Sequence, residues 1–314
     1  MQTQETNTNS TYYEHKDSQS WKSTMTRLLL LAAGIKSGKN IKKRLTTGEP
    51  GNNDVPEPPK NLQKKLNVKS WEVDGRNVFR LTPKQNATGK VILYIHGGAY
   101  VNNTSKYHWN FVDELIAKTG YTVILPDYPL APNNSFAECF QYMEKVYDDL
   151  ISHTNPSDVV IMGDSSGGGC SLALAQKLKE KGVAQPSQII LICPWLDVAL
   201  DNPDIAEKEK NDPFSGVEGL RLAGESYARG TDLDNYLVSP VNGDVEGLGK
   251  ISIFAAGDDI LEPDARLLKK ICEDKGVSIN YYYYPKMIHV WPILGFAESD
   301  VAIDQIVELL SEKK

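Results

Sequence analysis

The chain has 314 residues, of which 40% are hydrophobic and 24% charged, a balance typical of a folded globular protein rather than a disordered one. Its formal net charge of −7 and pI near 5.4 argue against binding to nucleic acid or anionic membrane, because an acidic surface repels phosphate. We therefore expect no nucleic-acid partner and no stable membrane association. The short basic runs at 39–44 and 60–69 are interpreted as solvated faces.

The first sixty residues divide into three segments of different composition. Residues 1–20 are rich in Thr, Asn, Gln and Ser, and they predict a mobile tail. Residues 21–45 predict one or two amphipathic helices, around 25–35 and 41–44. The following stretch, 46–60, is rich in Pro and Gly and predicts an irregular connector.

The cysteines and the apolar run 28–33 indicate the compartment. Cys139, Cys170, Cys193 and Cys272 lie far apart with no Cys-x-x-Cys pair, which favours buried reduced thiols over disulfides or a zinc site. The apolar run is too short for a membrane span and begins too late for a usual signal peptide. We therefore expect a cytoplasmic protein.

From residue 68 onward, short apolar runs alternate with helix-length amphipathic segments. The runs are 68–73, 78–81, 91–96, 122–126, 159–163, 189–193, 251–256 and 279–284, and the helical segments are 106–118, 136–152, 166–181, 262–275 and 298–312. This alternation predicts an α/β fold with a mostly parallel central sheet that has helices on both faces. The first two runs have no helix between them and predict an antiparallel start. A charged insertion at 200–235 is expected to lie over the carboxyl ends of the strands, where ligands bind in such folds.

The segment Gly163-Asp164-Ser165-Ser166-Gly167 follows one apolar run directly and precedes a helical segment. A sharp turn from strand to helix needs small neighbours, exposes the serine hydroxyl above the sheet and places it near the positive end of a helix dipole. The pattern alone is also found in ordinary turns. In this context it predicts that Ser165 is a nucleophile.

A serine hydroxyl needs a base to take its proton, and the chain has five histidines. In a fold of this kind the catalytic order along the chain is serine, acid, histidine. His289 is the histidine that follows Ser165, so it is the predicted base. The alternative is a core histidine that bonds to the backbone.

The segment His96-Gly97-Gly98-Ala99 ends an earlier apolar run. Acyl transfer places negative charge on the former carbonyl oxygen, and glycines let backbone N–H groups approach it closely. We expect the N–H groups of Gly97, Gly98 and Ser166 to form this oxyanion hole. Without the serine motif, the same segment would be interpreted as an ordinary turn.

Together these motifs resemble those of the hormone-sensitive-lipase-like carboxylesterases, which have an α/β-hydrolase fold. The resemblance spans roughly residues 90–295 and also rests on Asp127-Tyr-Pro-Leu-Ala-Pro132, Pro194-Trp195 and Asp259-Ile-Leu261. It implies a helical cap built from residues 21–60 and 200–235 over a hydrolase domain at 61–314.

The sequence departs from the family pattern at several positions. Ala99 replaces a third glycine and Ser166 an alanine, while the segment from Asp127 to Asn133 lacks the family's arginine and glutamate. The last two changes affect an expected structural ion pair rather than the chemistry.

Three aspartates near the run 251–256 could be the triad acid: Asp258, Asp259 and Asp264. Asp264 follows Glu262-Pro263, which is typical of a helix start, so its carboxylate is expected to serve that helix. The resemblance selects Asp259 over Asp258, because the family's acid directly precedes an apolar pair.

These residues predict a serine carboxylesterase that needs no cofactor and no metal, acting on a small-molecule ester through an acyl-enzyme. Tyr100, Trp195 and Trp291 adjoin the motifs and could narrow an acyl pocket, so short acyl chains are expected, although core packing explains Trp195 equally well. Lactone or amide hydrolysis by the same triad stays open, as does a homo-oligomer. A non-catalytic receptor on this fold is the less favoured alternative, since receptors of that kind have usually lost the histidine.

Overall fold

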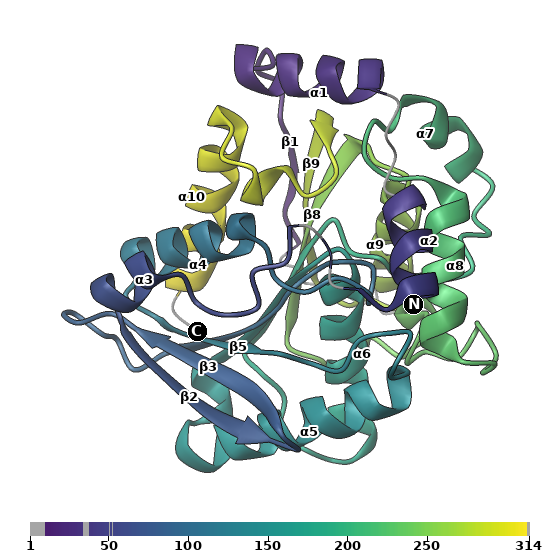
Figure 1. Cartoon of the computed structure of the whole chain (residues 1–314). Coiled ribbons are helices and arrows are strands. Elements are labelled where there is room, and N and C mark those ends of the chain that lie inside the picture. Colours follow the sequence, from purple (N-terminus) through teal and green to yellow (C-terminus); the bar gives the residue numbers. More distant parts are fainter. Residues whose placement is uncertain (1–9, 34–37, 50, 52, 313–314) are drawn as a thin grey trace, which may run out of the picture.

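The computed structural model describes residues 10–33, 38–49, 51 and 53–312. A nine-stranded sheet in the order β1-β9-β8-β7-β6-β4-β5-β3-β2 forms its centre (Figure 1). The strands are β1 (Tyr12–Glu14), β2 (Asn67–Val73), β3 (Arg76–Thr82), β4 (Val91–Ile95), β5 (Thr122–Pro126), β6 (Val159–Asp164), β7 (Gln188–Ile192), β8 (Lys250–Asp258) and β9 (Ile279–Ile288). The pairs β2–β3 and β3–β5 are antiparallel and the other pairs are parallel, which confirms the predicted fold class.

Alternation along the central strands fills a core on each face of the sheet. On β4, Leu93 and Ile95 belong to the core beneath α5 and α6, whereas Ile92 and Tyr94 belong to the core beneath α4 and α10. The helices are α1 (Trp21–Ala33), α2 (Gly38–Thr47), α3 (Lys60–Lys65), α4 (Lys106–Thr119), α5 (Phe136–His153), α6 (Ser166–Glu180), α7 (Ile205–Asn211), α8 (Val217–Ala228), α9 (Glu262–Asp274) and α10 (Ala297–Ser311). Because both faces are covered, the central strands are apolar throughout.

The insertion between β7 and β8 carries α7 and α8, and α8 packs against α2 from the N-terminal region (Figure 1). The two backbones approach so closely that a Cβ at Gly219 would lie 2.3 Å from the Cα of Gly38. Segments separated by about 180 residues in the chain therefore pack directly against each other.

The prediction of a mobile tail is wrong for residues 10–20, while residues 1–9 lie outside the described residues. Strand β1 pairs in parallel with β9, and the ring of Tyr12 stacks on Tyr281 with centroids 6.3 Å apart. The ring of Tyr13 lies tilted against Tyr282 and Tyr284, with centroids 6.0 and 5.8 Å apart. Polar composition predicts disorder, but these aromatic contacts and the backbone hydrogen bonds to β9 hold the segment on a tyrosine-rich edge.

Candidate active site

Ser165 lies at the turn between β6 and α6, as the motif predicted. Its backbone has φ +52° and ψ −123°, a positive φ that costs a non-glycine residue energy and persists when the surroundings fix it. Close packing explains the neighbouring Gly167, where a Cβ would lie 2.0 Å from the carbonyl oxygen of Ile95. The serine hydroxyl thus lies at the carboxyl end of the sheet and at the N-terminus of α6.

His289 follows β9 directly and lies between two partners. Its Nε2 is 3.0 Å from Ser165 Oγ, and its Nδ1 is 2.8 Å from Asp259 Oδ2. Burial lowers the pKa of His289, but the carboxylates of Asp259, Asp212 and Asp164 raise it more strongly, so the net change is upward. The structure therefore brings the three predicted triad residues into one hydrogen-bonded chain.

The competing aspartates have other partners. Asp258 Oδ2 forms an ion pair with Arg27 Nε at 2.7 Å. Asp264 lies in the first turn of α9 and accepts a hydrogen bond from the side-chain amide of Asn202 at 2.9 Å. Neither contacts His289, whereas Asp259 is 1% exposed and also accepts a hydrogen bond from the Leu261 N–H at 3.0 Å.

The expectation for Gly97 needs correction. Its N–H donates to Asp164 Oδ1 at 3.0 Å, and a Cβ at this position would lie 2.3 Å from the other oxygen of the same carboxylate. The Gly97 amide is therefore already engaged and is no longer free for an oxyanion. The N–H groups of Gly98, Ala99 and Ser166 donate no hydrogen bond to any of the described residues.

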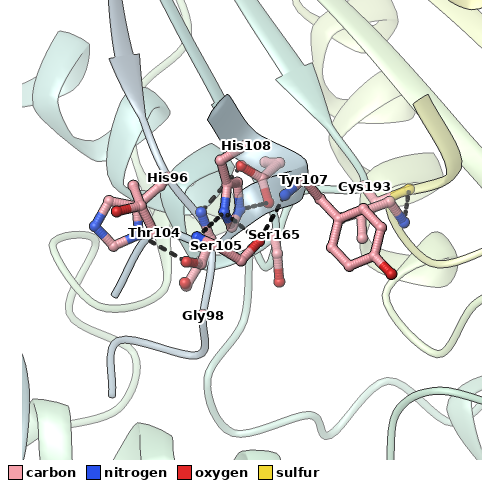
Figure 2. A network of polar contacts seen from close by, with 12 residues as sticks. His96, Gly98, Thr104, Ser105, Tyr107, His108, Ser165 and Cys193 are labelled. Carbon is pink, nitrogen blue, oxygen red and sulfur yellow. Dashed lines mark hydrogen bonds and ion pairs between the residues drawn. The ribbon is translucent and has the colours of Figure 1, made fainter. Parts of the chain in front are cut away.

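A buried polar network holds the loop after β4 that carries Gly97 and Gly98 (Figure 2). Asp164 also accepts hydrogen bonds from the Tyr94 hydroxyl at 2.7 Å and from His108 Nε2 at 3.4 Å. His108 Nδ1 accepts the backbone N–H of Ser105, which leaves Nε2 as the ring nitrogen that donates to the carboxylate. Burial raises the pKa of Asp164, but the contacts with His108, Tyr94 and the Gly97 N–H lower it by more, so the net change is downward and the group stays a carboxylate.

The neighbouring His96 is not available as a base. Its ring packs on Tyr128 with centroids 4.5 Å apart, and its Nδ1 lies 2.7 Å from the carbonyl oxygen of Gly97. Burial, and after it the nearby His108, lower its pKa to about 4, so the ring is neutral at physiological pH.

Asp212, a buried acid in the loop after α7, is a site residue that no sequence pattern marked. Its Oδ1 accepts the N–H groups of Phe214 and Ser215, and its Oδ2 accepts the N–H of Ile260 at 3.0 Å. Burial and the nearby carboxylate of Asp259 raise its pKa to about 6. Asp212 thus ties the cap insertion to the loop that carries the triad acid.

A cavity of about 650 Å³ opens at Ser165 and His289. Its apolar lining includes Leu30, Ile41, Phe214, Leu220, Ile293 and Leu294, and its polar lining includes Asn102, Ser105 and His108. The expected aromatic residues do not line it: Tyr100, Trp195 and Trp291 are at most 1% exposed. They pack in the core instead, where the ring of Tyr100 stacks on Tyr227.

Within the described ranges, one group of side chains has the spacing of a metal site: Cys193, Asp259 and His289, whose ligand atoms lie within 4.8 Å of one another. Both ring nitrogens of the histidine already have partners in the triad, and burial raises the pKa of the Cys193 thiol well above its usual value. A metal bound there would displace the triad contacts. All four cysteines are buried and free.

A nucleophile elbow after a parallel strand, with acid and histidine on the loops after later strands, defines an α/β hydrolase. A family model described as alpha/beta hydrolase fold matches residues 92–293. The chain belongs to this family, and the resemblance to its hormone-sensitive-lipase-like esterases is confirmed.

Three relatives illustrate the match. LipR of Mycobacterium tuberculosis, named as an acetyl-hydrolase, is 33% identical over 218 residues, which are 69% of this chain and 70% of LipR. A crystal structure described as an esterase from Staphylococcus aureus is 32% identical with a TM-score of 0.82, over 89% of this chain and 95% of that one. A crystal structure of a hormone-sensitive lipase from a metagenome library has a TM-score of 0.82 at 25% identity, over 94% of this chain and 99% of that one. The chain is accordingly an enzyme of the carboxylic-ester hydrolase class.

No helix in the described part of the chain is both long enough and apolar enough to cross a membrane.

Proposed function

We propose that the chain is a serine carboxylesterase that hydrolyses short-chain esters through Ser165, His289 and Asp259. The observation that carries this proposal is the unbroken chain of contacts from Ser165 Oγ through the imidazole to Asp259, with distances of 3.0 and 2.8 Å. A base must lie within hydrogen-bond reach of the proton that it removes, and His289 meets this requirement.

In the proposed reaction, His289 Nε2 takes the hydroxyl proton while Ser165 Oγ attacks the ester carbonyl. Asp259 accepts the Nδ1–H, which fixes the tautomer and stabilises the imidazolium that forms. His289 then gives the proton to the departing alcohol, leaving an acyl-enzyme. Water, deprotonated by the same histidine, releases the acid and restores the serine.

The proposed donors to the oxyanion are three backbone N–H groups, those of Gly98, Ala99 and Ser166. Ala99 takes the place that was expected for Gly97. This revision follows from the Asp164 carboxylate, which already accepts the Gly97 N–H. Asp164 would then fix the loop in position, so that the remaining amides are oriented before substrate arrives. The N-terminus of α6 adds a favourable dipole at the same place.

The short-chain preference rests on the cavity and on the relatives. A volume of about 650 Å³ must hold both the acyl and the alcohol part, which favours a small ester. LipR, which is named as an acetyl-hydrolase, points to the same class of acyl group.

The test is a panel of nitrophenyl esters with acyl chains of increasing length, run beside an emulsified triglyceride, a lactone and an amide. We expect kcat/KM to be highest for about two to six carbons. A value that climbs steadily to long chains would refute the preference. Faster turnover of the lactone or the amide would reassign the reaction to that class.

A further inference from the structure

Helix α1 has the reverse of the usual orientation of an amphipathic helix, since its polar side chains face the protein. Ser23 is 3% exposed and its hydroxyl donates to Glu298 at 2.9 Å, while Arg27 forms its ion pair with Asp258. In contrast, Trp21 is 78% exposed, Leu28 50% and Leu29 64%. A surface helix ordinarily buries its apolar stripe and exposes its polar one.

The exposed apolar side chains lie on one side of the helix rather than at positions scattered around it. Trp21 and Leu28 are separated by two helical turns and lie on the same side, and Leu29 adjoins them. Isolated exposed leucines are ordinary, but a contiguous apolar surface on a folded protein marks a contact with something else. Residues 2–9 of the sequence are all polar.

The same region is the basic part of an acidic protein. Residues 21–48 contain seven lysines and arginines and no aspartate or glutamate, although the whole chain carries a net charge of −7. Two of these cations, Arg27 and Arg44, pair with carboxylates of the body, Asp258 and Asp54. Lys22, Lys42 and Lys43 are exposed to solvent.

Two of these lysines have contacts at the surface. Lys22 Nζ donates to the carbonyl oxygen of Gly295 at 2.5 Å, a bond that keeps its positive charge. Lys43 lies 3.4 Å from Glu49, and both side chains are 65% exposed. A pair this exposed is screened by water and leaves most of the lysine's charge available.

Both helices border the active-site cavity. Leu30 of α1 and Ile41 of α2 line the same space as Ser165. Figure 1 shows α1 at the outer edge of the molecule. A surface that contacts the outer face of α1 would therefore lie next to the route by which a substrate reaches the serine.

We propose that the outer face of α1, with the exposed lysines of α1 and α2, adsorbs reversibly to an anionic lipid surface and that ester substrates enter the cavity from that surface. Trp and Leu on one face with Lys on the flanks are the composition of a helix that lies in the lipid interface. The second half of this proposal rests on the proposed esterase function. It narrows the substrate to a short acyl ester of an alcohol that dissolves in lipid.

A second copy of the chain is a poorer occupant. A two-fold contact through α1 would place this cation-rich region against itself, and like charges would oppose the association. The expectation of no stable membrane association came from the net charge of the whole chain. It did not consider one local region with the opposite sign.

The test uses the full chain carrying Ser165→Ala, so that binding is measured without turnover. Vesicles of phosphatidylglycerol or of phosphatidylcholine are added, and sedimentation and Trp21 fluorescence are followed. We expect the protein to sediment with phosphatidylglycerol, a blue shift that Trp21→Phe removes, and loss of binding as salt is raised. Leu28→Glu/Leu29→Glu should weaken binding at least about tenfold.

The matched control is Leu267→Glu, which charges a leucine on α9 that is 40% exposed and should leave binding unchanged. Equal binding to phosphatidylcholine, or no binding to either vesicle at low salt, would overturn the proposal. A dimer that Leu28→Glu/Leu29→Glu dissociates, without vesicle binding, would assign the face to a second copy instead.

With Ser165 intact, the variant Leu28→Glu/Leu29→Glu should hydrolyse dissolved nitrophenyl acetate at the same rate as the unsubstituted protein. Failure of the parent to hydrolyse that ester would refute the esterase function, and the vesicle measurements would still decide the adsorption.

Discussion

Neighbouring aspartates on one loop offer a sharp test of the triad, because they have different partners. Asp259→Asn keeps the side chain's shape and the acceptor for the Leu261 N–H, but it replaces a carboxylate oxygen by an amide that can turn its N–H toward His289 Nδ1. The imidazole then carries its proton on Nε2 and cannot accept the proton of Ser165. The loss in kcat from such a change reaches ~10⁴, which corresponds to about 5.4 kcal/mol of transition-state stabilisation.

Asp258→Asn is the matched control, one residue away. Its carboxylate is 21% exposed and pairs with Arg27, an ion pair of the kind that contributes about 1 kcal/mol or less. We expect kcat to fall less than about tenfold, or about 1.4 kcal/mol. Both purified variants would be assayed on nitrophenyl acetate, with circular dichroism and thermal melting to confirm folding. If Asp258→Asn loses more activity than Asp259→Asn, the assignment of the acid is wrong.

Three further outcomes follow from the geometry. Ser165→Ala should abolish hydrolysis and labelling by an organophosphonate, and mass spectrometry that places the label on Ser166 in the parent would contradict the motif. Asp212→Asn removes a negative charge that raises the pKa of His289, so the pH at which kcat/KM falls on the acid side should move down. Asp264→Asn replaces a buried acid with other partners and should leave that pH unchanged. Equal shifts in the two variants would count against the role of Asp212. Gly167→Ala forces a Cβ against the Ile95 carbonyl oxygen and should cost about 1–3 kcal/mol of unfolding free energy, and an unchanged melting temperature would show that the turn can relax.

The sequence predicted the fold class and the residues of the triad because both depend on local order along the chain. An apolar strand followed by Gly-x-Ser-x-Gly and a helix leaves little choice for Ser165, and His289 follows from chain order. Choosing between the adjacent acids needed the family pattern. Strand register, which sets the direction of each side chain, is not visible in a single sequence.

Other features depended on contacts between distant segments. Asp212 binds the N–H of Ile260, which lies 48 residues later, and no local pattern marks that pairing. The Gly97 amide is taken by Asp164, 67 residues away, so a correct motif led to an incorrect donor. For α1, periodicity indicates a stripe but not which side faces inward, since that depends on Glu298 and Asp258.

The short strand β1 also closes one end of the sheet. Without it, the edge of β9 that faces away from β8 would present free N–H and C=O groups at Tyr281 to Tyr283. An open edge of that composition is a template for pairing with other chains, so residues 10–14 act as a cover against aggregation. A truncated protein that begins at Trp21 would keep every catalytic residue and still lose solubility.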